Sequence, residues 1–388
     1  MIGKLLKLLL DGRKKSSKPT AHAKPAAGSA GFVAFIADID EPVFLGPGET
    51  LESAQASMRL RVAIPARELA RRYSVCLVPI DYVVSDPTLA GLGTVRAIVV
   101  GKTPVIFFTE RPERAEALVS WVETMAPRER MVVDFSDDLA AAAALSLQPA
   151  LVGFQRRLLR ACPATVPSNA LGARLAREAG HAITVIEDPY ESLAAGAPRF
   201  APGTTLRLVW FGIFDQPLRA FLEAQFATIA RRITGRPIEL AFVTYADRKS
   251  EAAELGHALQ AVNPAFFLRH VPWSLEAAAA ELERADLVVL PQDAASDWGR
   301  VKSHYRLVES IRAGRFAVAS PIPSYVELAN YAWIGNDLAA GVAWALDHPQ
   351  EVERRLAEGQ AYVAERFSPG RVAEKWAEVL GITETATS

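Results

Sequence analysis

The stretch KSHYRLVE holds the side chains best suited to chemistry in this sequence, namely Lys302, Arg306 and Glu309. Their intervals of four and three residues place all three on one face if the stretch is helical. Two cations suit a diphosphate, and a carboxylate suits the paired hydroxyl groups of a ribose. The spacing is therefore that of a nucleoside-diphosphate site. A solvated stripe of ion pairs would have the same spacing, because Arg306 and Glu309 are also neighbours on such a helix.

The elements around this stretch are expected to carry it to the edge of a sheet. Residues 287–290 form an apolar strand that ends in a polar loop, and a helix is predicted over residues 301–313. Gly314 ends this helix, and residues 316–320 form the next buried strand. The three polar side chains should therefore lie where parallel strands end.

A second polar feature follows the strand at 316–320. Ser324 and Glu327 have the spacing of a capping box, which predicts that another helix begins here. The free N–H groups of a helix start attract anions and hydroxyl groups. Ser324 and Tyr325 are therefore predicted to contribute to the same ligand site.

The rest of the chain has the pattern of an α/β protein with parallel strands crossed by helices. The Gly- and Pro-containing stretch AGAPRFAPGT at 195–204 breaks the pattern, which then restarts. We expect a basic tail at 1–30, a Rossmann-like domain at 31–200 and a second at 205–388. Two doubly wound domains facing across a cleft predict an interdomain site. The clearest strands are expected at 32–37, 75–79, 97–100, 105–108, 131–134 and 183–186, then at 206–211, 239–244, 267–270, 287–290 and 316–320.

At this point the sequence resembles a family. The segment VESIRAGRFAVAS is similar to the E-x-A-x-A-x-G-x-P-V-V-A pattern of GT-B glycosyltransferases, in the large retaining group that includes sucrose-phosphate and mannosyl transferases. The resemblance implies that Glu309 binds the ribose of a nucleotide sugar and that Gly314 forms the following turn. MVVDFSDD and ATVPSNALGARLAREAGHAITVIEDPYE resemble N-terminal segments of the family, and the stretch after Asp337 resembles its closing helices.

Three departures from the family pattern affect the expected chemistry. The family's earlier glutamate, eight positions before Glu309, is replaced by Val301. The family's Arg and Lys after the first strand of the second domain are absent from WFGIFDQPLRAF, where Arg219 is the only nearby cation. The glycine-rich loop after the first N-terminal strand is replaced by Asp38, Asp40 and Glu41. The retaining mechanism is therefore not carried over, and Lys302 and Arg306 are expected to take the diphosphate role.

These residues define an expected mechanism. Lys302 and Arg306 would stabilise the leaving diphosphate without a metal or cofactor, and the turn at Gly212 would give room for the donor. An inverting enzyme also needs a base, for which the strand-end acids are candidates, although each could instead cap a turn. The candidate bases are Asp38, Asp40 and Asp134.

Several other enzyme classes lack their motifs. GKT at 101–103 has no earlier P-loop glycine and is followed by Pro104. The glycine pairs at 46/48 and 91/93 do not complete a dinucleotide fingerprint. No G-x-S-x-G elbow and no HExxH sequence occur.

Composition limits the partners and the compartment. The 388 residues contain 43 Lys and Arg against 44 Asp and Glu, a net charge of −1 that argues against nucleic-acid binding. Two cysteines, Cys76 and Cys162, favour a reducing compartment, so we expect a cytoplasmic protein. The basic tail at 1–30 is read as a passive mobile segment, as a peripheral contact with the inner face of the membrane, or as a signal peptide.

The sequence thus predicts a glycosyltransferase that moves a sugar from a nucleotide-diphosphate sugar to a glycan, lipid or protein acceptor. A sugar-nucleotide epimerase or hydrolase of the same fold is the first alternative. A non-catalytic protein that binds sugar nucleotides or glycans is the second, because Val301 replaces the expected glutamate.

Overall fold

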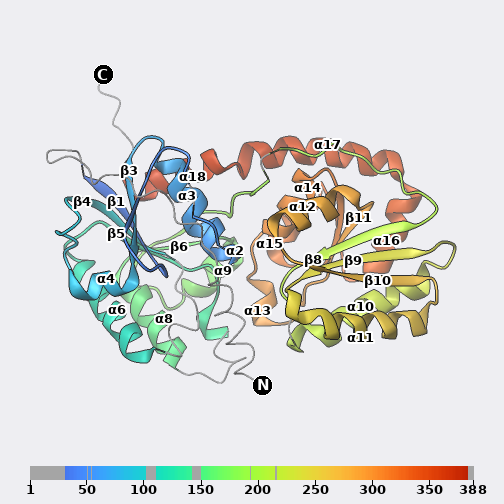
Figure 1. Cartoon of the computed structure of the whole chain (residues 1–388), viewed down its shortest axis with the longest axis horizontal. Helices are drawn as coiled ribbons and strands as arrows, with labels where there is room; N and C mark the ends of the chain where they lie inside the picture. The colour runs from blue at the N-terminus through green and yellow to red at the C-terminus, as the bar shows by residue number, and fades with distance from the viewer. Residues whose placement is uncertain are drawn as a thin grey trace. The chain divides into compact units, whose positions relative to one another are not determined.

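The computed structural model describes residues 31–49, 51–53, 55–101, 111–141, 150–192, 194–214 and 216–382 (Figure 1). The chain forms two compact units. The first runs to Pro189 and takes back the C-terminal segment from Ser368, and the second comprises Tyr190–Phe367. The predicted tail at 1–30 and the predicted strand at 105–108 lie outside the described residues.

The described part of the first unit contains a seven-stranded sheet in the order β2-β3-β1-β4-β5-β6-β7. All neighbouring strands are parallel except β2, which is antiparallel to β3. The chain order reverses between β1 and β4, the arrangement that leaves room for a ligand beyond the carboxyl ends of the strands. The strands are β1 (Phe32–Ala37), β2 (Val43–Leu45), β3 (Ser74–Pro79), β4 (Val95–Val100), β5 (Met131–Asp134), β6 (Ala164–Val166) and β7 (Ile183–Val185).

Apolar runs explain why these strands are central. Every residue of β1 is buried, as expected for a parallel strand covered on both faces. The helices of this unit are α2 (Ala56–Met58), α3 (Ile64–Leu69), α4 (Ile80–Ser85), α6 (Pro112–Met125), α8 (Ala150–Ala161), α9 (Asn169–Leu175) and α18 (Pro369–Val379), with a π-helical turn η1 at Arg59–Ala63.

The C-terminal helix differs from the prediction, which placed residues 205–388 in the second domain. Helix α18 packs in the first unit, where Trp376 is fully buried and its ring centroid lies 6.0 Å from that of Phe35. The Nζ of Lys375 also donates to the carboxylate of Glu187. The predicted linker at 195–204 lies inside the second unit, because the chain passes between units at Pro189 and again before Ser368.

The described part of the second unit contains a six-stranded parallel sheet in the order β10-β9-β8-β11-β12-β13. This is the doubly wound order, with its reversal between β8 and β11. The strands are β8 (Leu206–Phe211), β9 (Ile238–Thr244), β10 (Phe266–Pro272), β11 (Leu287–Leu290), β12 (Phe316–Ala319) and β13 (Trp333–Ile334).

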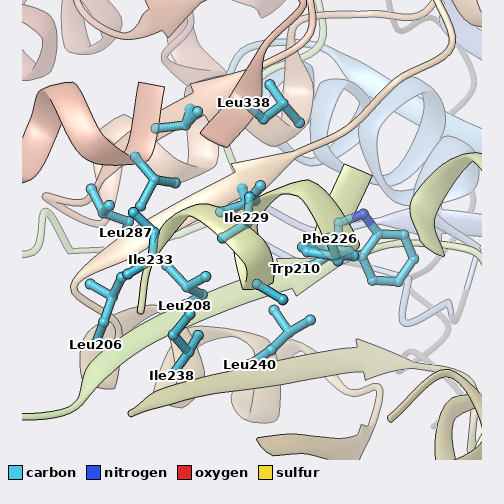
Figure 2. Packing of buried hydrophobic residues seen from close by; sticks show 14 of the residues in the cluster. Leu206, Leu208, Trp210, Phe226, Ile229, Ile233, Ile238, Leu240, Leu287 and Leu338 are labelled. Atoms are coloured by element: carbon cyan, nitrogen blue, oxygen red, sulfur yellow. The ribbon is translucent and has the colours of Figure 1, made fainter. Parts of the chain in front are cut away.

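Alternating side chains of β8 face two apolar layers. Leu206, Leu208 and Trp210 belong to one buried cluster, to which α10 and α11 contribute, and Val209 and Phe211 belong to the cluster on the other face. Figure 2 shows the first cluster, in which Phe226, Ile229 and Ile233 of α10 lie over Leu206, Leu208 and Trp210 of β8. The helices are α10 (Gln216–Arg232), α11 (Lys249–Val262), α12 (Leu275–Arg284), α13 (Asp297–Arg300), α14 (Tyr305–Arg312), α15 (Pro323–Val326), α16 (Leu338–Asp347) and α17 (Pro349–Arg366), with a 3₁₀ turn η2 (Ala246–Arg248).

The α/β class and the two Rossmann-like sheets agree with the sequence prediction. The strands predicted at 32–37, 131–134, 206–211 and 287–290 have the bounds of β1, β5, β8 and β11. Among the described residues, no helix combines the length and the apolar character needed to cross a membrane.

Candidate functional site

The edge of the second sheet where β8 and β11 end is the place that the topology offers to a ligand. The strand order reverses between these two strands, and in doubly wound sheets such a reversal is where the following loops diverge and ligands bind. Gly212 follows β8 directly, and Gln292 lies two residues after β11. The main-chain N–H of Gln292 donates to the Oγ of Ser320, at the end of β12, over 2.9 Å.

Arg306 on α14 reaches this edge. Its Nη2 donates to the Oε1 of Gln292 over 2.5 Å, and its Nη1 donates to the main-chain oxygen of Phe211 over 3.4 Å. A Cβ atom at Gly212 would lie 3.1 Å from the same Nη1. Gly212 and Arg306, both predicted site residues, are therefore brought together, and the absence of a side chain at Gly212 makes room for the guanidinium group. Sequence analysis missed Gln292, although a polar residue just after a buried strand was a usable signal.

Lys302 lies before α14 and not on it, which corrects the predicted helix at 301–313. Helix α14 begins at Tyr305, because residues 297–300 form the separate helix α13, which ends at Val301, and the N–H of Lys302 turns back to the main-chain oxygen of Gly299 over 3.3 Å. The Nζ of Lys302 lies 3.5 Å from the ring centroid of Trp298, a cation–π contact. The predicted helical stripe of Lys302, Arg306 and Glu309 therefore does not form.

Glu309 is buried, with 5% of its surface exposed, whereas the sequence analysis placed it on a polar face. Its Oε1 accepts main-chain hydrogen bonds from Glu191 and Ser192, the latter over 3.4 Å. Burial raises the pKa of Glu309 to about 7, against the opposing effect of the N–H group of Glu191. The carboxyl group thus titrates near neutral pH, and it is tied to the segment that begins the second unit.

Ser324 and Tyr325 are both buried, and they lie within the short helix α15 without capping its start. The short helix α15 has Pro323 in its first turn and Ile322 at its N-cap, which offers no side-chain acceptor. The hydroxyl of Ser324 donates to the main-chain oxygen of Lys302 over 2.8 Å, so it holds the loop that presents Lys302. Tyr325 is 1% exposed and packs in the apolar cluster with β11 and α14. The capping-box prediction is wrong.

The Glu327 carboxylate contacts His304 instead of capping that helix. The two side chains meet at 3.1 Å through the Nε2 of His304. His304 is 1% exposed, and its ring packs near Phe367 with a centroid distance of 5.4 Å. This burial and this ring contact indicate a packing role for His304.

The three candidate bases in the first unit have different surroundings. Asp38 and Asp40 follow β1, at the carboxyl edge where that sheet reverses its strand order, and Asp40 is exposed. Asp134, at the end of β5, is buried and accepts hydrogen bonds from Arg61 and from the hydroxyl of Thr165, the latter over 2.7 Å. A base needs access to a substrate proton, which the surroundings of Asp38 and Asp40 allow better than those of Asp134.

Arg61 is a buried cation that the sequence analysis missed. It lies on η1, contacts Asp134 over 2.6 Å and Asp188 over 3.2 Å, and donates to the main-chain oxygen of Ile186. Burial lowers the pKa of Arg61, but the charges and hydrogen bonds of Asp134 and Asp188 outweigh burial and raise it. No local sequence pattern predicts this pairing, because Arg61 and Asp134 are 73 residues apart in the chain.

Metal ligands are a separate question for the site. Within the described ranges, no group of three or more His, Cys, Asp or Glu side chains has an arrangement that could hold a metal ion. Arg306, Gln292 and Ser320 are polar groups at the edge of the second sheet, and such donors suit an anion with hydrogen-bond acceptors.

Solved structures with the same arrangement of elements identify the fold. HepE from Anabaena, in a crystal structure with UDP, has a TM-score of 0.60 at 12% identity, over 91% of this chain and 100% of that one. This chain has the GT-B fold. The trehalose-6-phosphate synthase OtsA has a TM-score of 0.56 at 11% identity, over 91% of this chain and 92% of that one.

A third solved GT-B structure is similar to this chain to about the same degree. It is a UDP-forming α,α-trehalose-phosphate synthase from Burkholderia xenovorans, with a TM-score of 0.53 at 9% identity, over 92% of this chain and 99% of that one. No known family profile and no curated protein sequence matches the chain. The GT-B fold confirms the fold that the resemblance of the Glu309 segment implied.

Proposed function

We propose that this protein is a glycosyltransferase that uses a nucleotide-diphosphate sugar as donor. One observation carries the proposal: the guanidinium group of Arg306 is fixed at the strand reversal of the second sheet, on the same helix as Glu309. In doubly wound sheets this edge is where nucleotides bind. The comparisons support the same donor class, because the Anabaena structure contains UDP and the Burkholderia enzyme is named as UDP-forming.

The proposed chemistry is the departure of a nucleoside diphosphate from the sugar. Negative charge grows on the diphosphate as the glycosidic bond breaks, and fixed cations stabilise that charge without reorganisation. Arg306 is held in place by Gln292, and Lys302 is held near Trp298, so both cations are partly oriented before the donor binds. We propose that they act without a metal ion.

Glu309 would recognise the ribose. The main-chain N–H groups of Glu191 and Ser192 donate to Oε1 of Glu309, and we propose that Oε2 accepts a hydrogen bond from a ribose hydroxyl group. For an inverting reaction, Asp38 and Asp40 are the proposed bases, since they follow the strand at which the first sheet reverses its order. The acceptor would be a glycan, a lipid or a protein with a free hydroxyl group.

Ligand-dependent thermal stability tests the donor. A ligand at a hundred times its dissociation constant stabilises the native state by about 2.7 kcal/mol, which a melting curve detects. UDP, GDP, ADP and their sugar derivatives should be compared, and we expect the UDP series to raise the melting temperature. Glu309→Gln should remove the shift while keeping the side-chain oxygen that the two N–H groups need.

Glu365→Gln is the matched control, because it removes an exposed carboxylate from α17 and should leave the shift intact. Equal shifts in Glu309→Gln and wild type would refute the ribose role. The absence of a shift with every nucleotide would refute the donor class.

A second function is favoured by one observation. Val301 stands where the family pattern has a donor-sugar glutamate, and it is buried at 7% exposure, so it offers no polar contact to a sugar. A protein that binds sugar nucleotides without transferring the sugar would need no such contact. Release of UDP from a UDP-sugar in the presence of acceptor glycans would distinguish transfer from binding alone.

A further inference from the structure

One face of α14 holds the segment that begins the second unit. Tyr305, Glu309 and Arg312 succeed one another at intervals of four and three, so they share a face of this helix. Each of them contacts the segment Tyr190–Ser192. This face differs from the one that the sequence analysis predicted, since Lys302 is not on the helix.

The contacts involve main chain and side chains. The hydroxyl of Tyr305 donates to the carboxylate of Glu191. The N–H groups of Glu191 and Ser192 donate to Glu309, and the guanidinium carbon of Arg312 lies 4.5 Å from the ring centroid of Tyr190. The N–H of Tyr190 also donates to the main-chain oxygen of Phe367 over 3.1 Å, next to the point where the chain leaves this unit.

These contacts determine how the carboxyl group of Glu309 is oriented. Two adjacent N–H groups fix Oε1, and they can do so only while the Glu191 segment keeps its place. Tyr305 holds that segment through its hydrogen bond to the side chain of Glu191. Arg306 lies on the same helix and reaches the edge of the sheet where β8 and β11 end. The helix therefore connects this edge to the segment Tyr190–Ser192.

We propose that Tyr305 and Glu191 are positioning residues for Glu309, which orient its carboxyl group toward the ribose of a bound nucleotide. The inference rests on the proposed function, because it assumes that Glu309 contacts a nucleotide. It goes beyond the family pattern, which concerns Glu309 alone and includes neither Tyr305 nor Glu191.

The main-chain N–H group and the side-chain charge of Glu191 have opposite effects on the pKa of Glu309. The N–H group of Glu191 lowers the pKa of Glu309, whereas the negative charge of the Glu191 side chain raises it. The other charged groups on the same helix are Arg306 and Arg312, and α17, which packs against this helix, presents the uncharged Gln360 to the main chain of Arg312. The charge of Glu191 is therefore the one that a substitution can remove without touching α14.

The pH dependence of UDP affinity tests the inference in the full-length protein. Wild-type affinity should fall as the pH drops through the pKa of Glu309, since the ionised carboxylate is the better acceptor for ribose hydroxyl groups. Tyr305→Phe should weaken UDP binding about five-fold at pH 7, as expected for one lost hydrogen bond, and should move the midpoint to higher pH.

Glu191→Gln should move the midpoint the other way, to lower pH. It removes the charge but keeps an acceptor for the hydroxyl of Tyr305, so the segment stays in place. Tyr331→Phe removes the hydroxyl of a tyrosine in the same unit whose ring packs against Tyr362, and should leave both the affinity and the midpoint unchanged. In steady-state kinetics, Tyr305→Phe and Glu191→Gln should each change KM more than kcat.

Three results are decisive. If wild type binds UDP and Glu309→Gln abolishes binding, but neither Tyr305→Phe nor Glu191→Gln shifts the midpoint, the positioning inference is refuted and the proposed function stands. If both variants lose the same affinity at every pH, their role is structural and the inference is again refuted. If wild type binds no nucleotide, the proposed function fails and the inference fails with it.

Discussion

Replacement of Arg61 by methionine should destabilise the first unit strongly. Methionine has a similar length and no charge, so the substitution leaves Asp134 and Asp188 without their shared cation. Arg61 and Asp134 are both buried, at 0% and 4% exposure. Three side chains and one main-chain oxygen converge on this site, and solvent cannot take the place of the guanidinium group.

The magnitude follows from the geometry of the pair. Arg61 contacts Asp134 through two nitrogen atoms, at 2.6 and 3.1 Å, and Asp188 at 3.2 Å. Removing one partner of such a buried pair costs about 3–5 kcal/mol, because the remaining charge is left in a medium of low dielectric constant. The ring of Trp376 also loses its cation–π partner, whose guanidinium carbon lies 5.5 Å from the ring centroid.

Arg157 offers a matched control in the same unit. It pairs with Glu116 at 2.6 Å and Glu123 at 2.7 Å, but its side chain is 34% exposed. Arg157→Met should therefore lower the free energy of unfolding by less than about 1 kcal/mol. Urea unfolding followed by circular dichroism measures both variants, and a loss in Arg61→Met no greater than that in Arg157→Met would refute the argument.

Two further predictions concern the second unit. The pKa of Glu309 is raised from 4.5 to about 7 in the folded protein, so its contribution to stability is present below pH 4.5 and is lost as the pH rises through about 7. Relative to wild type, Glu309→Gln should thus be more stable at pH 8 than at pH 5, and urea titrations at the two values that show no such difference would contradict the raised pKa. Lys302→Ala should lower kcat by about ten-fold or more with a smaller change in UDP affinity, because growing charge on the diphosphate is stabilised mainly in the transition state; a steady-state assay with undiminished kcat would exclude Lys302 from the diphosphate role.

The class of the fold and most strands were readable from local patterns. Strands such as β8 and β11 are short apolar runs between turn residues, and burial on both faces of a parallel sheet requires that pattern. The start of α14 was not predictable, because no local pattern shows that residues 297–300 form a separate short helix that ends at Val301. The N–H of Lys302 then turns back to Gly299 and not into a helix.

The domain assignment shows a similar limit. Helix α18 has an amphipathic pattern, which requires an apolar partner but does not identify it. Tertiary contacts such as the packing of Trp376 against Phe35 assign the helix to the first unit. Position along the chain predicted the second unit instead, because residues 205–388 are contiguous.

The sequence and the tertiary structure each determined part of the candidate site. The sequence by itself determined that Arg306 and Glu309 lie on one helix beside a strand end, because residue types and helical spacing are local properties. The tertiary structure decided that Arg306 meets Gln292, that Glu309 is buried against Glu191, and that Asp134 is paired. These pairings join positions up to 118 residues apart. Burial and partner identity depend on which surfaces the folded chain brings together, and that is why the pKa of Glu309 could not be inferred from its motif.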